Sequence, residues 1–270
     1  MTDSLTLGGG TVLLSRTDGI ATITLDRPDV LNSINHDMWH GLLEAFRVVA
    51  DEPADRCVVM RGSGRAFCSG ADLTDAAEGR GAAGVGRSNI DNMRKIGEVC
   101  LALHELPKPV VSAVHGVAAG AGCNLALAAD IVVAGPDARF CQIFARRGLS
   151  IDFGGSWLLP RLVGLHKAKE LTLLGEMIDA PEAHRIGLVN RLTDADGFEA
   201  EVSDVATRLA AGPPIALAAS KRLLDAGLSS SMAEALEAES MVQCVNFGTA
   251  DAVEAVMAFL EKREAHFQGR

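Results

Sequence analysis

The chain has 270 residues, which is enough to bury a large core and corresponds to one large domain or a domain with an appendage. Its formal net charge of -10 at pH 7 argues against a nucleic-acid footprint or a basic membrane patch, because either would need clustered lysine and arginine. We therefore expect neither nucleic acid nor membrane among the partners.

The six cysteines show no CxxC pair and no metal-ligand spacing, so we interpret them as reduced, buried thiols and expect no metal site. The N-terminal residues lack the basic start and apolar run of a signal peptide, and no stretch of about 18 apolar residues is present. Together these patterns predict a soluble, cytoplasmic protein.

Short β-branched runs alternate with helical stretches in the first half of the chain. Strands are expected at 20–25, 57–61, 110–114 and 131–134, and helices near 36–50, 90–105 and 122–129. This alternation predicts an α/β fold, in which ligands gather where strand ends turn into helices.

The strand signal fades after about residue 166. One more strand is expected at 187–192, and helices at 198–211, 214–226, 231–245 and 249–265. Within 252–260 only Glu254 is polar, so we expect the last helix to be buried on most sides by packing against another subunit. The glycine-rich segment 74–89 has no periodicity and is expected to be a mobile surface loop.

Two glycine-containing turns follow expected strands, GSGRAFCSGADL at 62–73 and HGVAAGAGCNLALAAD at 115–130. Backbone N–H groups exposed at such turns could bind an oxygen that becomes negative during a reaction. The alternative is that the small residues only allow tight turning and close packing. A dinucleotide site is not supported, because Leu125 occupies the third glycine position of the GxGxxG pattern.

Five motifs in order resemble the crotonase superfamily, the enoyl-CoA hydratase and isomerase fold. They are RPDVLNSIN (27–35), RAFCSGADL (65–73), KPVVSAVHGVAAGAGCNLALAADIVVA (108–134), LLPRLVG (158–164) and FLEKREAHF (259–267). The resemblance covers nearly the whole chain.

This resemblance implies a spiral of ββα units with the acyl-CoA site over residues 1–200 and a helical oligomerisation region over 201–270. It further implies an acyl-CoA thioester substrate, a homotrimer or a dimer of trimers, and no cofactor beyond the coenzyme A moiety of the substrate. The motif positions assign the oxyanion-hole N–H groups to Ala71 and Ala121. The substrate-binding residues implied in the same way are Val30, Leu31, Ser69, Gly70, Asp72, Leu73, Asn124, Phe144, Phe259 and Lys262.

Val30 and Leu31 match the loop along the pantetheine, and Phe259 with Lys262 matches a pair that reaches a neighbouring subunit's CoA. An ordinary solvated helix lysine is the alternative for Lys262.

The resemblance implies that hydration in this family uses two glutamates, which hold one water between them and act as general acid and general base. Their positions are occupied here by Asn124, which can hold a water but cannot take its proton, and by Phe144, which can do neither. The sequence therefore does not support a two-carboxylate hydratase.

Asp152 lies in the GLxxD context, with Gly148 and Leu149, that resembles family isomerases. A carboxylate among Ile151, Phe153, Phe144 and Trp157 would lose hydration, and its pKa should rise. We expect Asp152 to be the single base that shifts a double bond. The alternative is a turn aspartate whose side chain accepts bonds from the backbone ahead of the next helix.

Two other functions stay open from the sequence. One is an enoyl-CoA hydratase that works through Asp152 and Asn124, and the other is a weakly catalytic acyl-CoA-binding paralogue.

Overall fold

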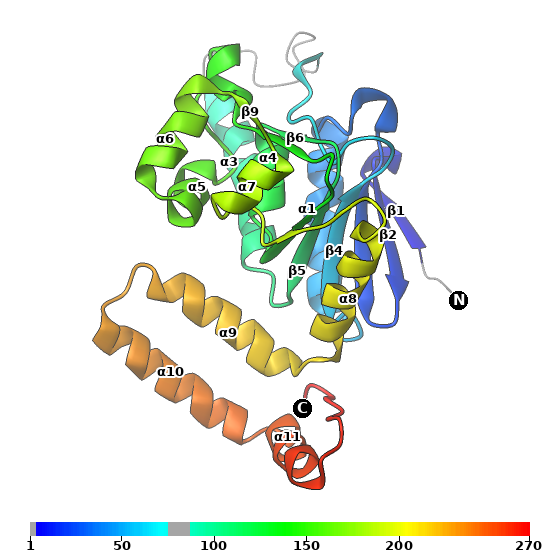
Figure 1. Cartoon of the computed structure of the whole chain (residues 1–270), viewed down its shortest axis with the longest axis vertical. Coiled ribbons are helices and arrows are strands. Elements are labelled where there is room, and N and C mark those ends of the chain that lie inside the picture. The colour runs from blue at the N-terminus through cyan, green and yellow to red at the C-terminus, as the bar shows by residue number, and fades with distance from the viewer. Residues whose placement is uncertain (1–3, 75–86) are drawn as a thin grey trace.

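The computed structural model describes residues 4–74 and 87–270, so most of the expected loop at 74–89 lies outside the described residues. In the described part, one sheet has seven strands in the order β1-β2-β3-β4-β5-β7-β10 (Figure 1). Their bounds are β1 Ser4–Leu7, β2 Val12–Thr17, β3 Ile20–Leu25, β4 Cys57–Gly62, β5 Val110–Val114, β7 Ile131–Ala134 and β10 Arg191–Leu192. The first three strands pair antiparallel, and every pairing from β3 to β10 is parallel.

A second, smaller sheet joins β6 Val117–Ala119 in parallel to β8 Arg139–Cys141, which pairs antiparallel with β9 Met177–Asp179. Isolated bridges from Cys68 to Ala118 and from Ile34 to Ala71 extend this layer toward the turns that leave β3 and β4. After β5 and β7 the chain thus passes through a strand of the small sheet before the next helix, and after β3 and β4 it passes through a bridge, which is the expected spiral of ββα units.

The helices of the core are α1 His36–Asp51, α3 Arg87–His104, α4 Ala121–Leu127, α5 Gly155–Val163, α6 Leu165–Leu174, α7 Ala180–Arg185 and α8 Phe198–Ala211. The two faces of the large sheet are covered differently. Val58 and Met60 of β4 belong to the main core, whereas Val59 packs in a separate cluster with Val202 and Val205 of α8. Burial on both faces explains why the central strands are continuously apolar.

The remaining helices, α9 Pro214–Gly227, α10 Met232–Phe247 and α11 Ala250–Glu261, extend away from the core at the bottom of Figure 1. Within one chain, α9 and α10 have no buried residue, and α11 buries only Asp251 and Ala258. Packing of α11 against another subunit stays a prediction. None of the described helices is long and apolar enough to cross a membrane.

The large elements coincide with the sequence expectations to within about four residues at their ends, and the α/β class is confirmed. The expected strand at 187–192 is wrong over its first four residues, because only Arg191 and Leu192 pair with β7. The expected boundary at residue 200 lies inside α8, which packs on the core sheet. Strands of three residues such as β6, β8 and β9 were not expected.

Gly62 closes β4 at a point where the chain folds tightly back on itself. A Cβ there would lie 2.3 Å from the oxygen of Ala66 and 2.4 Å from that of Phe67, whereas nothing lies within 4 Å at Gly97 in α3. We expect Gly62→Ala to lower the free energy of unfolding by about 1–3 kcal/mol through overpacking. Gly97→Ala should raise it by about 0.5–1 kcal/mol through helix propensity.

Urea unfolding of both variants measures these changes. Shifts of the same sign in the two variants would contradict this account of Gly62.

Candidate active site

Asp152 lies in the turn between a short 3-10 helix, Ile143–Arg147, and α5. Its carboxyl oxygen Oδ1 is buried without a hydrogen-bond partner among the described residues. The N-cap of α5 is Gly154 and receives no side-chain cap, so the interpretation of Asp152 as a capping turn residue is wrong. The bond into α5 is made instead by the Asp152 carbonyl, which accepts from the Gly155 N–H at 3.0 Å.

Burial raises the pKa of Asp152 to about 6, because the charged carboxylate loses hydration and gains no donor. Burial, with a further contribution from the charge of Asp152, raises the pKa of the Cys100 thiol to about 11. The thiol beside Asp152 is thus neutral near pH 7, and the pKa of Asp152 lies well above the ordinary value of 3.8.

The backbone after Asp152 is left-handed over two residues, with φ of 46° at Phe153 and 72° at Gly154. A positive φ is costly for a bulky residue such as phenylalanine. The buried ring of Phe153 stacks on Trp39 of α1, with ring centroids 5.3 Å apart and an interplanar angle of 29°. This packing holds the turn that carries Asp152.

Asn124, in the second turn of α4, is fully buried. Its Nδ2 donates to the Asp152 carbonyl at 2.8 Å, and its Oδ1 accepts from Gln142 Nε2 at 2.8 Å. The expectation that Asn124 lines the substrate site finds no support in these contacts, because both ends of its amide bind the protein. Phe144 is buried, with its ring near Gly120.

The two glycine-containing turns meet in space. Cys68 donates to the Val117 carbonyl and accepts from Ala119, each at 2.9 Å. A Cβ on Gly122 would lie 2.5 Å from the Cys68 oxygen, so glycine is required for α4 to approach this closely. A Cβ on Gly70 would lie 3.8 Å from the nitrogen of Ala121, which brings the segments of Ala71 and Ala121 together.

The N–H groups of both alanines have no hydrogen-bond acceptor among the described residues. Ala71 makes no hydrogen bond through its N–H with the described residues. Ala121 is the first residue of α4, where N–H groups have no intrahelical acceptor. The arrangement offers two backbone donors on adjoining turns.

The loop with Val30 and Leu31 runs beside the segment of Ser69. The Ser69 N–H donates to the Leu31 carbonyl at 2.9 Å, and its Oγ donates to the Val30 carbonyl at 3.4 Å. The side chains of Val30 and Leu73 are exposed on this edge. The structure therefore brings these residues, Gly70 and Ala71 to one edge, and their contact with a substrate stays a prediction.

Asp72 at the same edge is a different kind of carboxylate. Although partial burial would raise its pKa, hydrogen bonds from Thr74 and Arg27 lower the pKa to about 2. Its Oδ2 lies 2.8 Å from Nη1 of Arg27. Asp72 is therefore an ionised structural partner of Arg27 and is unsuited to act as a base.

Phe259 and Lys262 are not brought to this region within one chain. Phe259 is exposed on α11 and Lys262 ends that helix with φ of 56°, and α11 lies at the opposite end of the molecule from α4 and α5 (Figure 1).

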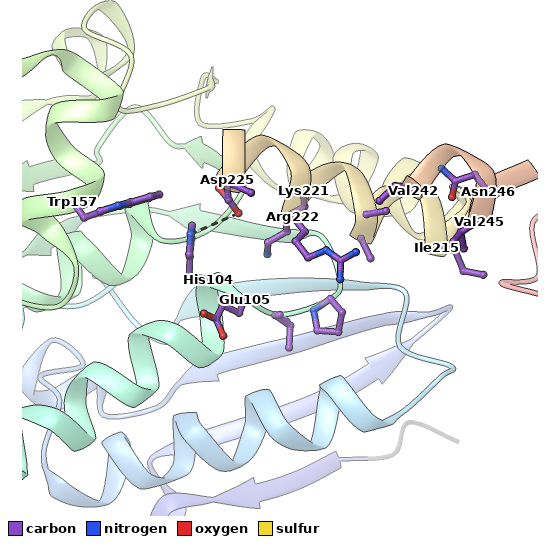
Figure 2. Close-up of a pocket in the computed structure, with 15 residues that line it drawn as sticks. His104, Glu105, Trp157, Ile215, Lys221, Arg222, Asp225, Val242, Val245 and Asn246 are labelled. Carbon is purple, nitrogen blue, oxygen red and sulfur yellow. Dashed lines mark ion pairs between the residues drawn. The ribbon is translucent and has the colours of Figure 1, made fainter. Parts of the chain in front are cut away.

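A cavity of about 720 Å³ opens between the end of α3, α5 and the helices α9 and α10 (Figure 2). In this cavity Nε2 of His104 lies 3.7 Å from Oδ2 of Asp225. The ring of Trp157 packs edge-on against the His104 ring, with ring centroids 5.2 Å apart. Asp152 does not line this cavity. Trp157 lines this cavity, and its expected place beside Asp152 stays a prediction.

Sequence reasoning missed Gln142, which follows β8 and is buried. A polar residue between Cys141 and Ile143 was the available signal, since a buried amide requires a partner.

A large sheet and a small sheet, with Cys68 after β4 pairing with Ala118 of β6, are followed by a run of helices, and this arrangement defines an α/β enzyme of the crotonase superfamily. The family model described as enoyl-CoA hydratase/isomerase matches residues 15–270, and the chain belongs to this family.

Two curated relatives carry different activities in their names. A "Probable enoyl-CoA hydratase" of Rhodobacter capsulatus is 44% identical over 96% of this chain and 98% of its own length. The "1,2-epoxyphenylacetyl-CoA isomerase" of Escherichia coli is 37% identical over 93% of this chain and 96% of its own length. The crystal structure of an enoyl-CoA hydratase of Mycobacterium smegmatis superposes with a TM-score of 0.88 at 33% identity, covering 95% of this chain and 98% of that one.

The buried carboxyl of Asp152 makes stability depend on pH. Because its folded pKa of about 6 lies above the ordinary value of 3.8, ionisation costs stability between these two pH values, and the cost stays constant above pH 6. We expect Asp152→Asn to be more stable than the wild type at pH 7–8 by about 1–3 kcal/mol. This difference should vanish below pH 4, and urea unfolding at a series of pH values measures it.

Asp72→Asn is the control of opposite sign, since the pKa of Asp72 is lowered and its charge stabilises the fold at neutral pH. A stability gain in Asp152→Asn that is equal at pH 3.5 and pH 7.5 would contradict burial of the charge as its cause.

Proposed function

We propose that this protein shifts a double bond in an enoyl-CoA thioester, with Asp152 as the single acid–base group. The observation that supports this most is the buried Asp152 carboxyl, which has no hydrogen-bond partner for Oδ1 and a pKa raised to about 6. A carboxylate that acts as a general base with a pKa near neutral pH must lose hydration and must still have an oxygen free to accept a proton.

In the proposed reaction, the thioester oxygen of a 3-enoyl-CoA accepts hydrogen bonds from the N–H groups of Ala71 and Ala121. These bonds acidify the carbon beside the carbonyl, and the Asp152 carboxylate removes one proton from it. The electron pair delocalises over the dienolate, whose oxygen is stabilised by the same two N–H groups. Asp152 then returns its proton to the carbon two positions along, which gives the 2-enoyl-CoA with no gain of water.

A second candidate is an enoyl-CoA hydratase, favoured by the names of relatives such as the one in Rhodobacter capsulatus. Syn addition of water needs a group that orients the water and a group that exchanges its proton. Asn124 is a weak choice for the first task, because its amide is bonded to Gln142 and to the Asp152 carbonyl. The third possibility, a weakly catalytic acyl-CoA-binding paralogue, would bind ligand without turnover.

We further propose that the protein works as a homotrimer or a dimer of trimers, with no cofactor beyond the coenzyme A moiety. Exposed apolar side chains along α10 and α11 support this, since so many large apolar side chains in water are unfavourable. They are Met232, Leu236, Met241, Val245, Phe247, Val253, Val256, Phe259 and Leu260. In such an assembly Phe259 and Lys262 would reach a neighbouring subunit's CoA.

The reaction is tested with trans-3-hexenoyl-CoA and with crotonyl-CoA in deuterated water, with products followed by mass spectrometry. We expect conversion of the 3-enoyl ester without water addition, and a kcat that rises with pH through about 6 as Asp152 ionises. Asp152→Asn should lower kcat about 10²–10⁴-fold, the usual contribution of a general base.

Asp204→Asn, which removes an exposed carboxylate of α8, is the matched control and should leave kcat unchanged. Rapid water addition to crotonyl-CoA, or isomerisation by Asp152→Asn at the wild-type rate, would overturn the assignment.

The proposed oxyanion donors are tested at Ala121. Proline is tolerated at the first position of a helix but has no N–H, so Ala121→Pro should lower kcat about 10²–10³-fold with the fold retained. Ala121→Gly keeps the N–H and should retain kcat within about threefold. Equal activity of the two variants would exclude the Ala121 N–H as a donor.

A further inference from the structure

Gln142 is a buried polar residue that the proposed reaction does not use. It is 3% exposed. Its Nε2 donates to Asn124 Oδ1 at 2.8 Å and contacts Cys123 Sγ at 3.4 Å, whereas its Oε1 is buried with no partner among the described residues. A half-satisfied buried amide is unfavourable compared with an apolar side chain of the same shape. The cost of burying Gln142 indicates that its hydrogen bond to Asn124 has a role in the protein.

That bond fixes the orientation of the Asn124 amide. Gln142 presents a donor to Asn124, so Asn124 must turn its oxygen toward Gln142 and its nitrogen away. The nitrogen then donates to the Asp152 carbonyl at 2.8 Å. Two hydrogen bonds in sequence thus connect the end of β8, through α4, to the turn that carries Asp152.

The site is built around this connection. A Cβ on Gly155 would lie 2.4 Å from Asn124 Nδ2 and 2.7 Å from Ile151 Cδ1, so only glycine leaves room for the amide. The next residue after Asp152, Phe153, is held at a φ of 46°, a conformation that persists only where the surroundings impose it.

Asp152 is bound to the protein through its backbone alone. Its carbonyl accepts from Asn124 and from the Gly155 N–H, while its side chain accepts no hydrogen bond from the described residues. The position of the Asp152 carboxyl is therefore set by the hydrogen bonds that hold the Asp152 backbone carbonyl.

We propose that Gln142 and Asn124 are positioning residues that hold the buried Asp152 carboxyl in place through the hydrogen bond from Asn124 to the Asp152 carbonyl. The reactive consequence rests on the proposed function of Asp152 as the base. When this bond is lost, the left-handed turn relaxes and the carboxyl reaches water. Its pKa then falls toward the ordinary value of 3.8, and its alignment with the substrate is lost.

Two variants break the two bonds separately. Gln142→Met keeps an unbranched side chain of similar length without a donor, and Asn124→Leu keeps the branched shape without a donor. Each should lower kcat for 3-enoyl-CoA isomerisation about 10–100-fold, since a shift of about 1 Å has effects of this size, and KM should change less than about threefold. The double variant should be no worse than the poorer single one, because the residues act in one chain of bonds.

The pKa of Asp152 is measured directly by carbon-13 NMR titration of protein labelled at the aspartate carboxyl carbons, with its signal assigned by its absence in Asp152→Asn. We expect this pKa to fall by one unit or more in both single variants. Should Gln142→Met fail to fold, Gln142→Glu takes its place. The introduced carboxyl donates to Asn124 only while protonated, so kcat should be lost as the pH rises.

Cys123→Ala is the matched control, because it removes the other contact of the Gln142 amide and leaves the bond to Asn124. It should lower Tm without changing kcat or the pKa of Asp152. If Gln142→Met and Asn124→Leu behave like this control, the amide pair has only a structural role and the proposal is wrong.

Failure of the reaction and failure of the positioning give different results. If the wild type does not isomerise 3-enoyl-CoA but the pKa of Asp152 falls in both variants, the reaction is wrong and the positioning holds. If the wild type isomerises and Asp152→Asn does not, while both variants keep kcat and pKa, the positioning is wrong and the reaction holds.

Discussion

Burying the Asp152 carboxyl without a donor for Oδ1 costs free energy, and the surroundings of this residue are what keep it buried. The carbonyl of Asp152 is bonded twice, and the ring of Phe153 stacks on Trp39 so that the strained turn cannot relax. The same buried position that destabilises the charged carboxylate raises its basicity. The cost in stability at this turn and the raised pKa of Asp152 thus have the same physical cause, the burial of the carboxyl.

The two backbone donors depend on a different constraint, the close approach of two turns. Glycine at position 122 lets α4 pack against the Cys68 carbonyl, and the small sheet fixes both turns through its bridges. The large sheet beneath is buried on both faces, so these turns start from a rigid base. Under the proposed function, the charge stabilisation and the proton transfer would thus come from two separate parts of the fold, the rigid turns and the restrained turn of Asp152.

The presence of hydratase and isomerase names among relatives at 44% and 37% identity has a physical explanation. The fold supplies the acyl-CoA site and the turns, whereas the few side chains facing the substrate select the reaction. In this chain one of the two hydratase positions is occupied by Asn124, whose amide is used to bind the Asp152 turn. The residue at this position therefore binds the turn that carries Asp152.

The amino-acid sequence by itself determined the α/β class, the strands that are buried on both faces, such as 57–61, and the position of Asp152 among apolar neighbours. These features can be predicted from the sequence because they depend on the periodicity, composition and order of residues that are close together in the chain. Only the tertiary structure decided that Gln142 bonds Asn124, that Asn124 bonds the turn, and that Trp157 lines the cavity beside α9 and α10. The three-residue strands were missed for a related reason, since they form only when distant segments meet. The partner of a buried side chain is set by how segments far apart in the chain pack, and no local pattern records it.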